Sequence, residues 1–365
     1  MSRAYRRELT LWLLIMITWV TYRCVKVLRK PMSEVGTVRQ GSSAKFESPV
    51  TEASGLCPEP SLDRSGVRTA GFKPTYWTHN DSFDDPRAFR VSLDGKILDE
   101  IRLSEVSHVD WEACTSAAND PYDGSSVVYI ADSGNNFHWR DELVVYAFRS
   151  QFSAQGRPTL KLIRSYAYRF PRSNRSPPLS YVPPHARCLD IESIFWRDGE
   201  LFMISKCAVS VSPMLWRLPR ENEKQRSVES SLTLEPITVL EIIPSVHPLY
   251  ERITDASYHS DSRLLVALTY QSLWFYRVSG ESRHPTFTQV GRCELNILGR
   301  KVNQAEATSW VVSDEQKEEG RDKLPFSGTN EEVLHFDNLA VLTERGDVYR
   351  YKVQQAVHEG VRCFP

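Results

Sequence analysis

Acidic residues recur in this 365-residue chain at an unusual place, the beginning of runs that otherwise predict buried strands. The run "SHVDWEACTS" (107–116) carries Asp110 and Glu112 on either side of a tryptophan. Similar acids begin "EASGL", "ESIFW", "DASYH" and "EATSW", namely Glu52, Glu192, Asp255 and Glu306. Buried carboxylates that lie close together must be protonated or paired, and oxygen-rich clusters of this kind suit a hard cation such as Ca²⁺.

The segments that follow each acid indicate how the acids are positioned. A second β-rich run ends in polar residues, as in "VVYIADSGNN" (127–136), and a third run is rich in aromatic residues. In four of the units a fourth alternating run closes the set, and turn signals such as "LDGK" and "RDGE" separate the runs. Four antiparallel strands repeated along a chain are typical of a β-propeller.

We therefore expect an all-β fold, a single propeller of four-stranded blades. Five blades are favoured, with the segment around "AKFES" supplying the fourth strand of the fifth blade. Six blades are the alternative, if the insertion at 171–187 contains a degenerate blade. An array of β-sandwiches is a competing interpretation, because the long spacings blur the repeat.

In a propeller, the innermost strand of each blade starts at one mouth of the central channel, and the second strand returns to it. We therefore expect the repeated acids and the polar ends of the second runs to meet, with Asp190 at the same mouth. The predicted ligands of a Ca²⁺ ion are Glu52, Asn80, Asp81, Asp110, Glu112, Asp132, Asn135, Glu192, Asp255 and Glu306. The spacing fits neither an EF-hand nor a zinc site. A purely structural role, capping backbone N–H groups of a neighbouring blade, is the alternative for each single acid.

Two functions follow from this site. The first is a metal-dependent hydrolase of a phosphoester, ester or lactone, in which Asp110, Glu112 and Lys206 are the predicted catalytic residues and Arg187 helps to bind an anionic group. The chain has no G-x-S-x-G motif, which argues against an α/β-hydrolase triad. The second is a non-catalytic module that binds a protein or glycan partner through loops such as 171–187 and 313–332.

The N-terminal segment predicts a membrane anchor. "LTLWLLIMITWVTY" (9–22) is apolar, basic residues flank it, and no small-residue cleavage site follows. We expect a cytosolic tail and signal anchor over 1–30, a stalk over 31–49, a propeller over 50–355 and a C-terminal tail over 356–365. The last stalk residues are expected to enter the fold.

Cysteines and charge limit the compartment and the partners. Cys188 and Cys207 bracket two strands joined by a turn, which predicts a disulfide, with two unrelated buried thiols as the alternative. With the sequon at Asn174, this favours a lumenal or extracellular body, although the basic flank after the anchor favours the opposite orientation. The net charge of −1 indicates no nucleic-acid partner, and we expect a monomer.

The order of the motifs resembles that of bacterial phytase-like or "esterase-like" propellers, most of them uncharacterised. The matching motifs are "EASGL" (52–56), "HND" (79–81), "VDWE" (109–112), "ADSGNN" (131–136), "DIES…ISK" (190–206), "ITDAS…LTY" (253–270) and "QAEA" (304–307). Asn135 stands where the family pattern has Asp, and "QAEA" replaces "QGEA". The resemblance implies a propeller and a divalent-cation site more firmly than it implies a reaction.

Overall fold

The computed structural model describes residues 44–46, 48–60, 74–82, 84–120, 124–171, 188–207, 212–220, 231–242, 251–281, 283–297, 300–301, 304–311, 333–356 and 360–364. Every regular element in these residues is a strand, and none of them belongs to a helix that could cross a membrane. The predicted anchor at 1–30, the sequon at Asn174, Arg187 and the loop 313–332 lie outside them, as does nearly all of the loop 171–187.

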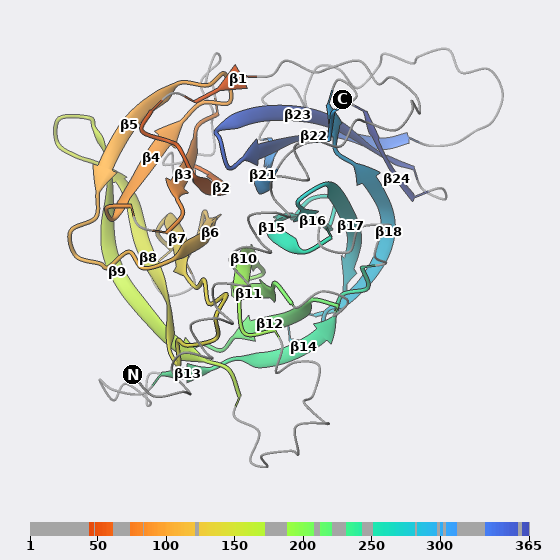
Figure 1. Ribbon diagram of the computed structural model, residues 1–365, viewed down its shortest axis with the longest axis horizontal. Helices are drawn as coiled ribbons and strands as arrows, with labels where there is room; N and C mark the ends of the chain where they lie inside the picture. Colours follow the sequence, from red (N-terminus) through yellow and green to blue (C-terminus); the bar gives the residue numbers. More distant parts are fainter. Residues whose placement is uncertain are drawn as a thin grey trace, which may run out of the picture. The chain divides into compact units, whose positions relative to one another are not determined.

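Five antiparallel sheets of four main strands follow one another around a ring (Figure 1). The first blade contains β2 (Ala53–Pro58), β3 (Tyr76–Asn80), β4 (Arg87–Val91) and β5 (Ile97–Arg102). The second contains β6 (Trp111–Ala117), β7 (Val127–Asp132), β8 (Leu143–Phe152) and β9 (Pro158–Arg169). The third contains β10 (Ile191–Arg197), β11 (Glu200–Ser205), β12 (Met214–Leu218) and β14 (Glu235–Val239).

The last two blades complete the ring. The fourth contains β15 (Ile253–His259), β16 (Leu264–Thr269), β17 (Ser272–Ser279) and β18 (Thr286–Glu294). The fifth contains β21 (Ala305–Val311), β22 (Val333–Thr343), β23 (Asp347–Ala356) and β1 (Ala44–Lys45). Short additions are β13 (Leu232–Thr233) beside β9, β24 (Gly360–Phe364) beside β23, and the pair β19 (Asn296–Ile297) and β20 (Arg300–Lys301).

The N-terminal strand closes the ring, as the sequence predicts. Ala44 pairs with Val348 and Lys45 with Asp347, so β1 is the outer strand of a blade whose other strands come from the C-terminal part of the chain. Five blades are thus confirmed, and the six-blade alternative is wrong. Residues 360–364, within the predicted tail, form β24 and extend the fifth blade.

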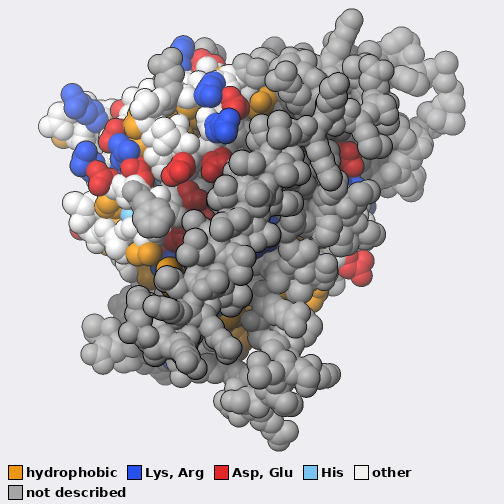
Figure 2. Space-filling model, in the orientation of Figure 1, with side chains coloured by type: hydrophobic (Ala, Val, Ile, Leu, Met, Phe, Trp, Pro, Cys, Tyr) orange, Lys and Arg blue, Asp and Glu red, His pale blue; other side chains and the backbone are white. Residues whose placement is uncertain are grey.

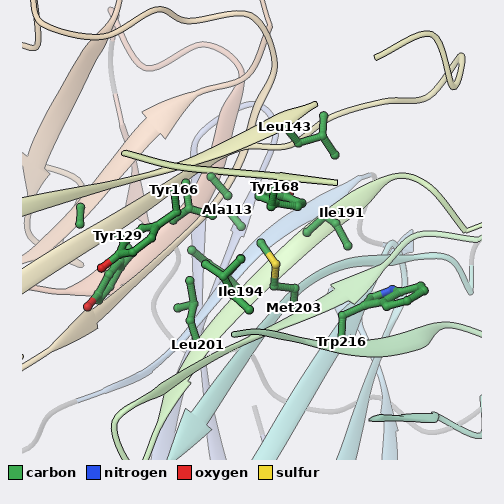
Figure 3. Packing of buried hydrophobic residues seen from close by; sticks show 14 of the residues in the cluster. Ala113, Tyr129, Leu143, Tyr166, Tyr168, Ile191, Ile194, Leu201, Met203 and Trp216 are labelled. Atoms are coloured by element: carbon green, nitrogen blue, oxygen red, sulfur yellow. The ribbon is translucent and has the colours of Figure 1, made fainter. Parts of the chain in front are cut away.

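The hydrophobic core consists of five clusters, one at each boundary between neighbouring blades. Figure 3 shows the cluster between the second and third blades, where Tyr129 and Tyr168 pack towards Ile194, Met203 and Trp216. Because neighbouring blades cover both faces of a sheet, the strands near the axis are buried almost throughout, whereas the outer strand β5 alternates.

Two disulfides tie the inner part of the ring. Cys57 of β2 is bonded to Cys114 of β6 and links the innermost strands of the first two blades. Cys188 and Cys207 are bonded across the ends of β10 and β11, which confirms the predicted pair. Their Cα atoms lie 4.3 Å apart, beside the segment of chain that carries Asp190 and Lys206.

Candidate metal centre

A β-bulge occurs near the start of the innermost strand in every blade. In each, the pairing with the second strand skips one residue; the five skipped residues are Gly55, Glu112, Glu192, Thr254 and Glu306. A bulged residue is unpaired and its side chain is re-aimed relative to the pleat. Three of the five blades therefore turn a glutamate out of the ladder at the same level of the ring.

The bulges correct the alignment of the repeat acids. Glu52 lies three residues before the bulge of the first blade and is exposed, and Asp255 lies one residue after the bulge of the fourth blade. The equivalents of Glu112 in these blades are Gly55 and Thr254. The sequence alignment is therefore wrong for these two blades, because strand side chains alternate and one residue of shift reverses the direction of a side chain.

Carboxylates of the first three blades gather at this end of the ring. Asp81, Asp110 and Glu112 each offer an oxygen within 4.8 Å of the other two, and so do Glu112, Asp190 and Glu192. The two groups share Glu112, which gives one acidic cluster of five carboxylates. The space-filling view shows Asp and Glu side chains gathered near the middle of the ring (Figure 2).

The loop that follows β7 shapes the acidic cluster. The N–H groups of Ser133 and Gly134 donate to the carbonyl of Asp110, at 3.0 and 3.1 Å. A Cβ at Gly134 would clash with Asp110 Oδ2 and would lie 2.5 Å from Glu112 Oε1, so any larger residue here would force the two carboxylates to move. The Asn135 N–H donates to Asp190 Oδ1 at 2.6 Å.

Hydrogen bonds from Ser82 orient two members of the group formed by Asp81, Asp110 and Glu112. Ser82 donates its N–H to Asp81 Oδ1 at 2.6 Å, and its hydroxyl donates to Asp110 Oδ1. Asp190 Oδ2 is buried without a hydrogen-bond partner among the described residues. An unpartnered buried carboxylate oxygen is costly unless a proton or a cation contacts it.

Lys206 neutralises only part of the cluster. Its Nζ lies 2.8 Å from Glu192 Oε1, and the ammonium lies 5.5 Å from the ring centre of Tyr270. Both partners of the ion pair are buried. Burial lowers the pKa of Lys206, but the charges of Glu192, Tyr270, Glu112 and Glu306 together outweigh burial and raise the pKa well above its ordinary value. Lys206 therefore stays charged and belongs to the Glu192 end of the cluster.

The carboxyl groups are held in an environment that disfavours their charge. Burial, followed by repulsion from Glu192, raises the pKa of Asp81 to about 7. Burial also raises the pKa of Glu192 to about 8, with the charge of Asp190 adding to it and Lys206 opposing it. The pKa of Glu112 is raised well above its usual value by burial and by Glu192 and Asp81. Without a cation, this cluster must share protons at neutral pH.

Three predicted ligands already have full sets of partners. Asn80 accepts from the N–H groups of Thr51 and Glu52 and donates to Pro49 and Asp84. Asp132 accepts from the N–H groups of Val109 and Asp110 and pairs with Arg140 at 2.7 Å. The side chain of Asn135 is bonded to the backbone of Arg140 in both directions. In this structure these side chains support the loops around the cluster.

The remaining predicted ligands do not belong to the two carboxylate groups, although Glu306 lies close enough to Lys206, Glu192 and Asp81 to interact with their charges. Asp255 accepts from the Thr308 N–H of the next blade at 2.7 Å, as expected of an acid that caps a neighbour. Its burial raises its pKa well above the usual value. Glu306 is half-buried, and removal from bulk water raises its pKa. Glu52 is exposed.

Several residues of the site were not predicted from the sequence. Asp190 was placed at the mouth but not among the ligands, although its spacing from Glu192 repeats that of Asp110 from Glu112. Ser82 and Gly134 gave no signal of their own, because their roles depend on strands brought together by the ring.

The fold and site define a five-bladed β-propeller with an acidic cluster at one end of its innermost strands. No family model and no curated protein matches the chain, so the resemblance to phytase-like propellers has no support from either comparison. A functionally unknown protein from Desulfotomaculum acetoxidans DSM 771 is similar over 80% of this chain and 71% of its own, at 13% identity and a TM-score of 0.32. Saccharomyces cerevisiae Sqt1 is similar over 86% of this chain and 99% of its own, at 10% identity and a TM-score of 0.31.

Proposed function

We propose that this propeller binds a divalent cation, Ca²⁺ in the first instance, through Asp81, Asp110 and Glu112. The observation that carries the proposal is the approach of three carboxylates, from two separate segments of the chain, to within 4.8 Å of one another. Oxygens that share one Ca²⁺ at about 2.3–2.6 Å lie no more than about 5 Å apart, so this separation suits the ion.

The position of Lys206 favours one end of the cluster for the ion. Its ammonium pairs with Glu192 and would repel a cation bound among Glu112, Asp190 and Glu192. The group formed by Asp81, Asp110 and Glu112 lies at the other end and has hydroxyl and amide donors from Ser82 as its hydrogen-bond partners. We place the ion there, with Glu52, Asn80, Asp132, Asn135, Asp255 and Glu306 outside its coordination shell.

For the reaction class we propose metal-assisted hydrolysis of a phosphoester, ester or lactone. A bound Ca²⁺ supplies a Lewis acid for the oxygen of the scissile group. In this proposal Asp81, Asp110 and Glu112 hold the ion, and a carboxyl of the cluster that lies outside the coordination shell accepts a proton. Lys206 keeps its charge and offers it to an anionic group of the substrate.

Calorimetric titration and thermal unfolding of the full chain test the cation site. We expect one Ca²⁺ per chain, bound more tightly than Mg²⁺, and a stability gain of about 2.7 kcal/mol at about 100 times the Kd. Glu112→Gln should abolish both signals, whereas Glu105→Gln, an exposed acid on the loop before β6, should leave them unchanged. Unchanged melting with Ca²⁺ and with chelator would contradict the proposal.

The reaction is tested separately with aryl phosphates, aryl esters and lactones. Turnover should require Ca²⁺ and should fall in both Glu112→Gln and Lys206→Met, while the second variant still binds the ion. If Ca²⁺ binds and no substrate of these classes is hydrolysed, the enzymatic part of the proposal is wrong and the cation site stands.

We also propose that the propeller is monomeric, lies in an oxidising compartment, and is tethered to a membrane by residues 1–30. The buried disulfides Cys57–Cys114 and Cys188–Cys207 support the compartment, since such bonds persist outside the reducing cytosol. Protease protection and thiol labelling of the full chain in vesicles would test the orientation.

A further inference from the structure

The loop between β7 and β8 presents two aromatic side chains to solvent. Phe137 is 75% exposed and Trp139 is 76% exposed, more than any other large hydrophobic side chain in the described residues. Their ring centres lie 5.2 Å apart and the rings are tilted by 47°. Exposed aromatic side chains of this size are among the groups that contribute most to binding when a ligand covers them.

The two rings stand on a turn that is held in place by hydrogen bonds. Arg140 donates to the carbonyl of Gly134 at 2.8 Å and pairs with Asp132 at 2.7 Å. Asn135 accepts from the N–H of Arg140 through its side chain, and from the N–H of His138 through its carbonyl. A turn fixed at both ends keeps the aromatic pair exposed, so a ligand would meet a preformed surface.

The same turn forms one wall of the acidic cluster. Gly134 lies against Asp110 and Glu112, and the Asn135 N–H donates to Asp190. The aromatic rings therefore stand two to five residues along the chain from the residues that touch the carboxylates. The exposed aromatic pair and the residues that contact the carboxylates share one short segment of chain, residues 134–139.

This combination matches the chemistry of a sugar ring. A pyranose has an apolar C–H face, which packs on an exposed aromatic ring, and hydroxyl groups, which donate to carboxylates or coordinate Ca²⁺. A flat aromatic ligand would favour two parallel rings, and these rings are tilted. A free anion would be repelled by the carboxylates in the absence of the cation.

We infer that Phe137 and Trp139 form a carbohydrate-binding platform, with the hydroxyls of the bound pyranose directed to the acidic cluster. The inference deepens the proposed function, because the same carboxylates hold the proposed cation. The platform itself does not depend on the cation, since the carboxylates can accept hydroxyl hydrogen bonds directly.

An array of pyranose-containing glycans tests the inference, followed by calorimetric titration of the best binder with Ca²⁺ and with chelator. We expect the double variant Phe137→Ser and Trp139→Ser to weaken glycan binding by about tenfold or more, with the Ca²⁺-dependent melting shift unchanged. Phe152→Ser is the matched control, because Phe152 is a half-exposed aromatic at the opposite end of β8, and it should leave glycan binding unchanged.

The outcomes separate the two proposals. If no glycan binds, or if the double variant binds glycan as well as the control does, the carbohydrate platform is wrong even where Ca²⁺ still binds. If glycan binding depends on the two rings and Ca²⁺ has no effect on melting, the platform stands and the cation site fails. If the double variant loses binding to anionic phospholipid vesicles but keeps its binding to glycan, the two rings form a membrane contact and the inference is wrong.

Discussion

Two buried acidic sites in this propeller are built in opposite ways. Glu251 accepts hydrogen bonds from Thr269, Ser272 and Trp274 and pairs with Arg292 at 2.6 Å. The acidic cluster gathers Asp81, Asp110, Glu112, Asp190 and Glu192 around one ammonium, that of Lys206. Glu251 has more donors than charges, and the cluster has more charges than donors.

The difference indicates which acids are structural. A carboxylate whose two oxygens both have hydrogen-bond or ion-pair partners contributes to stability and has no oxygen left to bind a ligand. Asp132, which pairs with Arg140, is a carboxylate of this kind, like Glu251. A group of carboxylates with raised pKa values and an unpartnered oxygen is under-compensated, and such arrangements are enriched at functional sites. Crowding of acids alone would not have distinguished the two sites.

Replacing the basic side chain of each site should produce the largest difference in stability between the two sites. Arg292→Met leaves Glu251 buried beside neutral donors, and we expect the free energy of unfolding to fall by about 3–5 kcal/mol. Lys206→Met should cost about 1–2 kcal/mol, because Glu192 has a pKa of about 8 and can remain protonated at pH 7. Urea unfolding of both variants with chelator at pH 7 measures the two values, and equal losses would break the comparison.

The buried, neutral side chain of His79 extends the comparison to acidic pH. Burial lowers the pKa of His79 to about 4 from 6.5, so the unfolded chain takes up a proton first as the pH falls. The stability is unaffected above about pH 6.5 and declines by about 3 kcal/mol towards pH 4. His79→Gln should remove this loss in unfolding curves at pH 7 and pH 4.5, and the exposed His284→Gln should not.

The acidic cluster should respond to pH in the opposite direction. The pKa values of Asp81 and Glu192, about 7 and about 8 in the folded protein, lie above their ordinary values. The stability is therefore highest below the ordinary carboxyl pKa values, near about 4, and falls as the pH rises until the folded-state values, about 7 and about 8, are passed. We expect the melting temperature with chelator to fall between about pH 5 and about pH 8 and to level off above that range. Ca²⁺ should flatten this decline, and a decline that persists unchanged in Glu192→Gln would have another origin.

The smallest expected effect is the change in stability when one glutamate of each site is replaced by glutamine, and the two changes should have opposite signs. In chelator, Glu112→Gln relieves repulsion in the cluster, and we expect a gain of up to about 1 kcal/mol. Glu251→Gln should destabilise the protein, because it weakens the pairing with Arg292. Denaturation midpoints at pH 8 compare the two, and a loss of stability in both variants would show that Glu112 is structural in the same sense as Glu251.

The sequence by itself determined the propeller and most of its strands. Runs such as "VVYIAD" and "LWFYRV" are buried from both faces in any blade, so their composition reveals them, and the short "AKF" segment was identified as the missing outer strand. The repeated acid before a small residue located one end of the innermost strands. These signals are local, because they depend on the period and composition of a single strand.

The tertiary structure alone decided which acids meet. Glu112 and Glu192 occupy bulges, whereas Asp255 is shifted by one residue and caps a neighbouring blade. Bulge register, the glycine at position 134 that lies against Asp110, and the ion pair of Lys206 with Glu192 arise from contacts between neighbouring strands of one blade, whereas the meeting of Glu112 with Glu192 and Asp190 arises from contacts between blades. A one-residue shift reverses the direction of a side chain, and such a shift is set by the pairing with the neighbouring strand rather than by the composition of the strand itself.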